Sequence, residues 1–179
     1  MNQPNYNNIT FDFHSKWEID ELNPNYLNHI YWIDIYIDGV DLKQLVIEYT
    51  NKYFEQEETI AAYDEFWLEW MVGSLGIEEN TGYTKKGDLI CCSCGSHGCY
   101  SIMCTIVEKK DKVIWKNFTD LNKADYKIPE LVFEKEQYTN ELNKLKAFYD
   151  NADFEPKDRY YWDENDELVE FIPSELIKE

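Results

Sequence analysis

Three apolar segments joined by short turns constrain the fold of this chain more than any other feature. They are residues 88–94, 99–107 and 112–118. Each has the composition of a β-strand, and the connections between them are short enough for hairpins. The middle segment is apolar on both faces, which is typical of a central strand. The sequence therefore predicts a three-stranded antiparallel meander over about residues 88–118.

Other segments alternate between strand and helix patterns. Period-two alternation predicts strands over 9–13, extending towards Ile19, and over 31–37, which the Asp38-Gly39 turn closes. Helical spacing predicts helices over 42–49 with Asp41 as N-cap, from Ile60 to Met71, and over 134–151, whereas 77–87 reads as an exposed loop. Residues 160–162 and 168–171 predict a C-terminal hairpin. Because strict β-α-β alternation is missing, we expect a single α+β domain over residues 1–179, mainly antiparallel sheet with two to three packed helices.

All five cysteines of the chain fall within fourteen residues, around a glycine-containing turn. If residues 95–98 form a hairpin loop, Cys94 faces Cys99, Cys92 faces Ser101 and Cys91 faces Ile102. This register places Cys92, Cys94 and Cys99 on one face. It places Cys91 and Cys104 on the other, beside Leu89, Ile102 and Ile106.

Three thiols on one face, with a histidine in the loop, suit a tetrahedral zinc site made of Cys92, Cys94, His97 and Cys99. Structural zinc sites usually combine two separated ligand pairs, whereas these ligands all come from one turn. In the competing interpretation the glycines shape the turn and the cysteines are small apolar residues. A redox role for the thiols is a third interpretation. We therefore expect no cofactor, with zinc as the alternative.

The run from Cys92 to Cys99, followed by Val113-Ile114-Trp115 and Phe118, resembles an uncharacterised bacterial family. Its members share a Cys-x-Cys-Gly-x-x-Gly-Cys turn and a Val-x-Trp strand. Asp38-Gly39-Val40-Asp41-Leu42 matches a further motif of the family, and Phe133, Tyr138, Glu141 and Leu142 match its helix entry. The likeness covers patches of residues 30–150, and the C-terminal hairpin departs from it. The resemblance implies a bacterial origin and a fold but no chemistry.

The chain is strongly acidic, with a net charge of −19. Residues 1–80 carry −13, residues 81–128 carry +3 and residues 129–179 carry −9. Such a chain repels nucleic acids and anionic membranes, and it attracts basic proteins. Because there is no signal-peptide pattern and no apolar run of membrane-spanning length, we expect a cytoplasmic protein.

No catalytic motif is evident, and aromatic residues form 16% of the chain. Tyrosine and tryptophan are common anchors of protein interfaces. The sequence therefore favours a non-enzymatic binding protein, most specifically an immunity-type protein that neutralises a basic toxin. The alternative is a small zinc-stabilised domain with a regulatory role. The acids expected to face the partner are Glu55, Glu57, Glu58, Asp64, Glu65 and Glu69.

Two further groups of residues are weaker candidates. His14 and His29 are isolated in the sequence and are interpreted as surface or interface residues, not as bases. Asp34, Asp38 and Asp41 could suggest a cation site, but strands that alternate apolar and polar residues produce such spacing without a metal.

Overall fold

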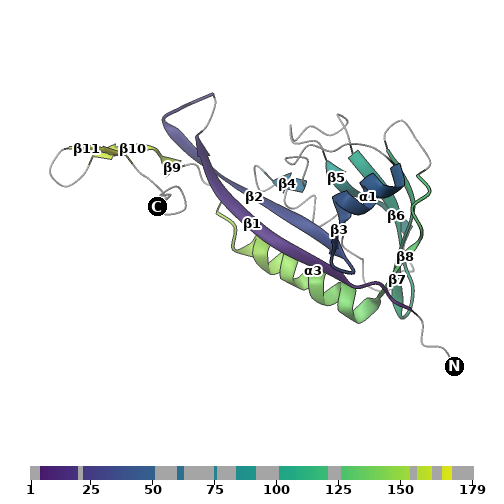
Figure 1. Ribbon diagram of the computed structural model, residues 1–179. Helices are drawn as coiled ribbons and strands as arrows, with labels where there is room; N and C mark the ends of the chain where they lie inside the picture. Colours follow the sequence, from purple (N-terminus) through teal and green to yellow (C-terminus); the bar gives the residue numbers. More distant parts are fainter. Residues whose placement is uncertain are drawn as a thin grey trace.

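The structure is a computed structural model, and it describes residues 5–19, 22–50, 60–62, 75, 84–91, 101–120, 126–153, 157–162 and 167–170. Two antiparallel sheets, a separate two-stranded hairpin and two helices, α1 and α3, make up the regular structure of the described residues (Figure 1). This arrangement confirms the predicted α+β class with a mainly antiparallel sheet.

The first sheet is built on a long hairpin of β1 (Ile9–Ile19) and β2 (Tyr26–Ile37). Their register runs from Ile9 opposite Ile37 to Ile19 opposite Leu27. Three short strands pair with the other edge of β2 in succession, namely β9 (Lys157–Asp158), β4 (Ile60–Ala62) and β3 (Val40–Asp41). β2 is therefore the central strand of this sheet, and β1 lies at its edge.

The Asp-Gly sequence of the turn between β2 and β3 suits the backbone conformation of that turn. Asp38 and Gly39 both adopt positive φ, 53° and 80°, as the two central residues of a type I′ turn do. The chain then enters α1 (Leu42–Thr50), where Asp41 Oδ1 accepts the backbone N–H of Lys43 at 2.6 Å. This contact confirms Asp41 as the N-cap, because the carboxylate satisfies a backbone N–H that has no partner inside the helix.

The second sheet has the order β5-β6-β7-β8 and contains the predicted meander. Its strands are β5 (Thr84–Cys91), β6 (Ser101–Glu108), β7 (Lys112–Asp120) and β8 (Leu131–Glu134). The last strand leads directly into α3 (Lys135–Asp150), which confirms the helix predicted over 134–151.

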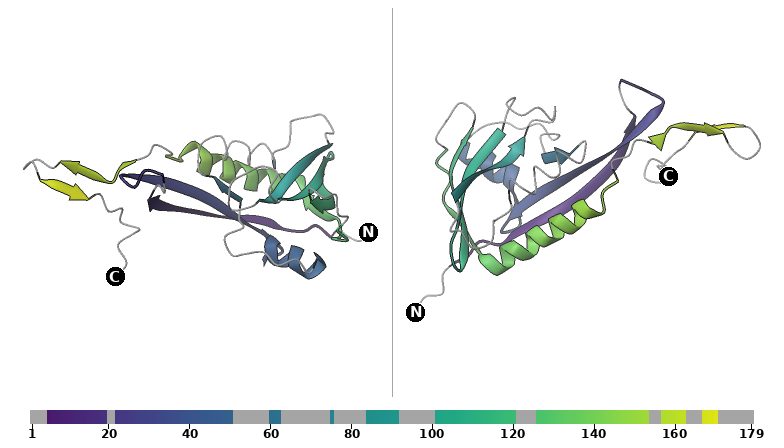
Figure 2. Two further views of the ribbon diagram at one scale, coloured as in Figure 1. Left: turned by 90° about the horizontal axis from the view of Figure 1, so that it is seen from above. Right: turned by 180° about the vertical axis from the view of Figure 1, so that it is seen from behind.

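Both sheets contribute to one buried cluster. Trp115, Phe133 and Tyr138 form its aromatic centre, and each is fully buried. Ile9, Ile33, Ile35 and Ile37 reach the cluster from the hairpin, and Leu145 reaches it from α3. Figure 2 shows α3 lying along the β1–β2 hairpin. The strands that the sequence predicts as alternating therefore direct their apolar residues into a shared core.

A second hairpin lies beyond the far end of the first and projects away from the core (Figures 1 and 2). It consists of β10 (Tyr160–Trp162) and β11 (Leu168–Glu170), as the sequence predicts. We call it the C-terminal arm.

Three local predictions are wrong. Ile60–Ala62 is strand β4 and not the start of a helix, because its residues lie opposite Ile33, Trp32 and Tyr31 along the edge of β2. The loop expected over 77–87 gives way to strand at Thr84, since β6 is long enough to pair with it. Cys91 lies opposite Ser101 instead of Ile102, so β5 is one residue out of the predicted register at this end, and a further irregularity lies between Asp88 and Ile90.

No helix in the described ranges is long and apolar enough to span a membrane.

Candidate functional site

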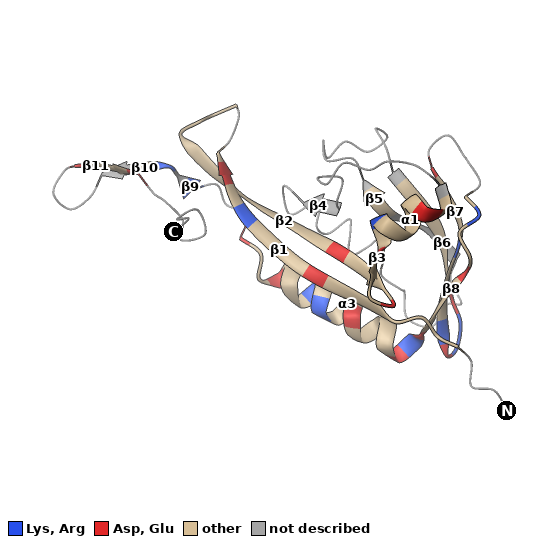
Figure 3. Ribbon diagram, viewed as in Figure 1, with Lys and Arg blue, Asp and Glu red and all other residues tan. Residues whose placement is uncertain are grey.

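One face of the β1–β2 hairpin gathers charged and aromatic side chains. Alternation brings Asp12 and His14 of β1 to the same face as Trp32, Asp34 and Tyr36 of β2. We call these five residues the carboxylate face. Figure 3 shows both strands carrying acidic residues in the part of the hairpin nearer β3.

Two carboxylates lie directly opposite each other on this face, at Asp12 and Asp34. Like charges in this position destabilise a sheet unless another group offsets them. The His14 imidazole Nε2 lies 3.1 Å from Asp34 Oδ2 and 3.6 Å from Asp12 Oδ2. These contacts are ion pairs only when His14 is protonated.

A lysine provides the permanent positive charge beside this face. Lys43 Nζ lies 3.2 Å from Asp34 Oδ1 and 3.7 Å from Asp41 Oδ2. Asp38 is turned away and accepts hydrogen bonds from Asn7 Nδ2 and from the backbone N–H of Asn8. The three aspartates that could have suggested a cation site are therefore held by protein groups.

The charge around Tyr36 remains negative. Burial, and then the charges of Asp34, Asp41 and Asp12, raise the pKa of Tyr36 above its usual value. Among the described residues, Lys43 is the lysine whose charge acts on Tyr36 against these three carboxylates. The Tyr36 hydroxyl therefore stays protonated and can donate a hydrogen bond.

Aromatic rings extend the face towards the tip of the hairpin. The rings of His14 and Trp32 are stacked with their centroids 5.1 Å apart, and Lys16 Nζ lies 5.8 Å from the Trp32 centroid. This distance is within the range of a cation–π contact. The face thus combines an indole that accepts a cation with carboxylates, and Asp12 is well exposed at 61%.

His29 lies on the other face of the hairpin. Its ring stacks on Trp17 with centroids 4.3 Å apart, and its Nδ1 is 2.8 Å from the Tyr31 hydroxyl. These contacts pack the ring between aromatic neighbours.

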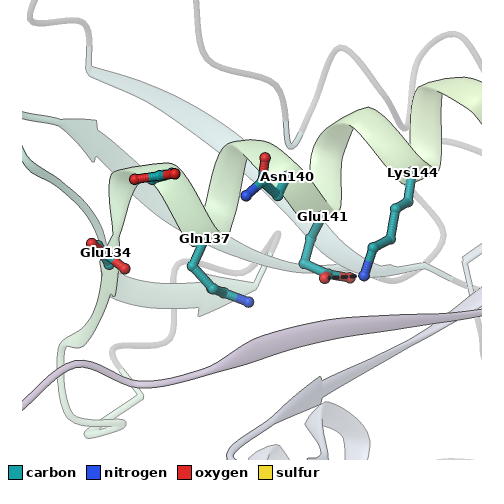
Figure 4. A pocket seen from close by; sticks show the side chains of 6 residues that line it. Glu134, Gln137, Asn140, Glu141 and Lys144 are labelled. Carbon is teal, nitrogen blue, oxygen red and sulfur yellow. Dashed lines mark hydrogen bonds and ion pairs between the residues drawn. The ribbon is translucent and has the colours of Figure 1, made fainter.

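A polar groove lies along α3, and two of its lining side chains reach the backbone of β1 (Figure 4). Its lining residues are Glu134, Glu136, Gln137, Asn140, Glu141 and Lys144. Gln137 Nε2 donates to the Ile9 carbonyl, and the Phe11 N–H donates to Glu141 Oε2 at 3.4 Å. Lys144 pairs with the other oxygen of Glu141, as the dashed line in Figure 4 marks.

The groove is best explained by its structural role. An edge strand presents unpaired backbone groups that invite pairing with another chain. Gln137 and Glu141, one helical turn apart on α3, occupy one carbonyl and one N–H of the β1 edge. They close that edge where the hairpin meets the core.

The residues chosen from the sequence as site candidates lie outside the described ranges. These are the zinc candidates Cys92, Cys94, His97 and Cys99, and the acids Glu55, Glu57, Glu58, Asp64, Glu65 and Glu69. Both assignments stay predictions. Within the described ranges, no group of three or more His, Cys, Asp or Glu residues is arranged to hold a metal ion. Cys104 is buried beside Ile102 and Ile106, on the predicted side of its strand.

The carboxylate face was missed as a site because it depends on strand pairing. The alternation of Asp12, His14, Trp32 and Asp34 is visible in the sequence. Their meeting on one face follows only from the register of β1 against β2.

Comparisons with protein-family models, curated proteins and solved structures find no match to this chain. The family resemblance described above therefore stays an expectation.

Proposed function

We propose that this chain is a non-enzymatic binding protein whose partner is a basic protein, and that the carboxylate face takes part in the contact. The observation that carries this proposal is the placement of exposed Asp12 beside the stacked rings of His14 and Trp32. A lysine or arginine of a partner can pair with Asp12 while its aliphatic stem lies along the rings.

The charge of the whole chain supports the same partner class. A net charge of −19 accelerates encounter with a basic surface and disfavours acidic partners. The aromatic groups then supply the short-range contacts that determine affinity. In its most specific form, the proposal describes an immunity-type protein that neutralises a basic toxin.

The test compares two charge reversals with equal effect on net charge. Asp12→Lys alters the carboxylate face, whereas Glu130→Lys alters an exposed carboxylate on the loop before β8. Association rates are measured against a set of small basic proteins, basic toxin domains among them, at low and high salt. We expect at least one partner whose on-rate falls as salt rises, and a several-fold larger loss for Asp12→Lys than for Glu130→Lys.

Equal losses for the two variants would leave only a general charge effect and would remove the carboxylate face from the proposal. If no basic protein binds, or if on-rates are indifferent to salt, the proposed function is wrong.

A further inference from the structure

The far end of the β1–β2 hairpin is the most apolar exposed part of the described chain. Seven large hydrophobic side chains are exposed among the described residues, and five of them lie at this end or on the adjoining arm. We call these five the apolar end; they are Ile19, Leu22, Tyr26, Tyr160 and Leu168. Leu22 is 98% exposed and Leu168 is 58% exposed. Clusters of this kind mark interaction sites more often than single exposed apolar residues do.

The only arginine of the chain fixes the arm against the hairpin turn. The Arg159 backbone N–H donates to the Asn25 carbonyl at 2.7 Å, and Nη1 donates to the Pro24 carbonyl at 3.4 Å. Its Nε donates to Glu170 Oε1 at 2.8 Å, and its guanidinium lies 5.2 Å from the centroid of the Tyr160 ring. Arg159 therefore contacts β10, β11 and the β1–β2 turn at once, which holds the apolar end together.

The arm also offers backbone for pairing. Among the described strands, β10 and β11 pair only with each other. An isolated two-stranded hairpin is marginally stable in water and gains stability when a third strand is added. Addition of an extended segment to such an edge is a common mode of peptide recognition.

The negative charge of the arm favours a basic partner segment. The sequence from the start of β10 to the end of β11, residues 160–170, contains five acids and no bases, a net charge of −5. This charge disfavours pairing with a second copy of the same arm and favours a basic segment.

We infer that the apolar end is a docking site for an extended, basic segment of a partner protein, which adds to the arm as a strand and places apolar side chains against Leu168 and Tyr160. The choice of a basic partner rests on the proposed function. The docking end itself is a second surface, separate from the carboxylate face.

The probe is a dodecapeptide that alternates lysine and valine. One control peptide has glutamate in place of lysine, and another has the same sequence with N-methylated valines, which cannot donate strand hydrogen bonds. Binding to the full chain is measured by fluorescence anisotropy, and the contact surface is mapped by amide chemical shifts. We expect shifts at Tyr160 and over 168–170, and much weaker binding of both control peptides.

The variant is Leu168→Ser, and its matched control is Val40→Ser, which alters an exposed apolar residue of the β2–β3 turn. Both changes keep the net charge and leave the core intact. We expect Leu168→Ser to weaken peptide binding about tenfold and Val40→Ser to leave it unchanged.

The outcomes separate this inference from the proposed function. Binding that Asp12→Lys weakens but Leu168→Ser does not would overturn the docking end and leave the basic partner in place. A concentration-dependent dimer that Leu168→Ser abolishes would identify a second copy as the occupant and overturn the inference. If the lysine–valine peptide does not bind although basic proteins do, the docking inference is also overturned.

Discussion

At the scale of single residues, two aromatic side chains hold the core through polar atoms. Trp115 Nε1 lies 3.2 Å from the Tyr138 hydroxyl, which donates to the Leu75 carbonyl at 2.8 Å. Both rings are fully buried and meet edge to face, with centroids 6.1 Å apart. Since buried polar groups are costly without partners, this chain of contacts specifies how the rings pack.

Truncation of Trp115 should therefore destabilise the fold strongly. We expect Trp115→Ala to lower the free energy of unfolding by about 3–5 kcal/mol, because it leaves a large cavity and removes the donor to the Tyr138 hydroxyl. Urea denaturation monitored by circular dichroism measures the change. Leu168→Ala, at an exposed position, is the control and should change stability by less than about 0.5 kcal/mol. An unaltered midpoint for Trp115→Ala would show that the core lies elsewhere.

Tyr138 should make stability sensitive to high pH. Burial raises the pKa of Tyr138 well above its usual value, so the folded protein keeps the proton while the unfolded chain releases it near pH 10. The unfolded state then binds fewer protons, and stability must fall as pH rises above about 10. The same direction holds for Tyr31 and Tyr36, whose pKa values burial also raises.

Tyr138→Phe tests this assignment through two readouts. At neutral pH we expect a loss of about 1–3 kcal/mol, because Trp115 Nε1 and the Leu75 carbonyl lose their partner. Between pH 9 and pH 11, the variant should lose less further stability than the wild type, as measured by urea midpoints at each pH. Parallel pH profiles for the two proteins would contradict the role of Tyr138.

At the scale of elements, α3 does more than cover the sheet. Tyr138 and Leu145 pack into the core, whereas Gln137 and Glu141 reach the backbone of β1. Phe148 packs against Phe13 with ring centroids 4.8 Å apart, so the contact continues along the helix. The helix thus positions the hairpin that carries the carboxylate face.

Removal of the Glu141 carboxylate should loosen this edge. We expect Glu141→Ala to cost about 1–2 kcal/mol and to speed hydrogen exchange of the Phe11 amide, because its acceptor is lost. Glu141→Gln keeps an acceptor oxygen, so in this variant the Phe11 amide should exchange at a rate closer to that in the wild type. Hydrogen exchange followed by NMR distinguishes the two variants. Equal protection of Phe11 in both would mean that Glu141 does not cover the edge.

The elements show which parts of the fold the sequence could predict. The meander, α3 and the Asp38-Gly39 turn follow from periodicity and turn chemistry, which are local signals. Ile60–Ala62 could not be predicted, because three apolar residues fit a helix as well as a strand and only the edge of β2 decides. The register of Cys91 was wrong by one residue, because a strand pattern does not indicate which residue of the neighbouring strand lies opposite.

The candidate site was less predictable than the fold for a related reason. Asp12 and Asp34 are far apart in the sequence, and only the pairing of β1 with β2 places them opposite each other. Lys43 reaches Asp34 because α1 begins directly after β3. Sequence patterns reveal which face of a strand is polar, but not which polar face of another strand lies beside it.

At the scale of the whole molecule, two electrostatic effects act in opposite directions. The net charge of −19 repels itself and destabilises the compact state. Local ion pairs such as Lys43 with Asp34 and Lys146 with Asp150 stabilise it. Exposed pairs contribute little, typically below about 1 kcal/mol, and salt weakens both effects.

Because the acids outnumber the bases by 36 to 17, we expect the repulsion to dominate and the melting temperature to rise with sodium chloride. Between 0.01 M and 0.3 M salt the screening length shortens from about 30 Å to well under 10 Å, so repulsion between distant acids is lost before attraction within close pairs. Each kcal/mol regained should raise the melting temperature by about 2–4 °C in a chain of this length. Differential scanning calorimetry across this salt range measures the effect.

Glu130→Gln, which removes one exposed charge outside the carboxylate face, should raise the low-salt melting temperature slightly and flatten the salt dependence. A melting temperature that falls with salt would show that close ion pairs outweigh the net charge, and the acidic surface would then stabilise the fold itself.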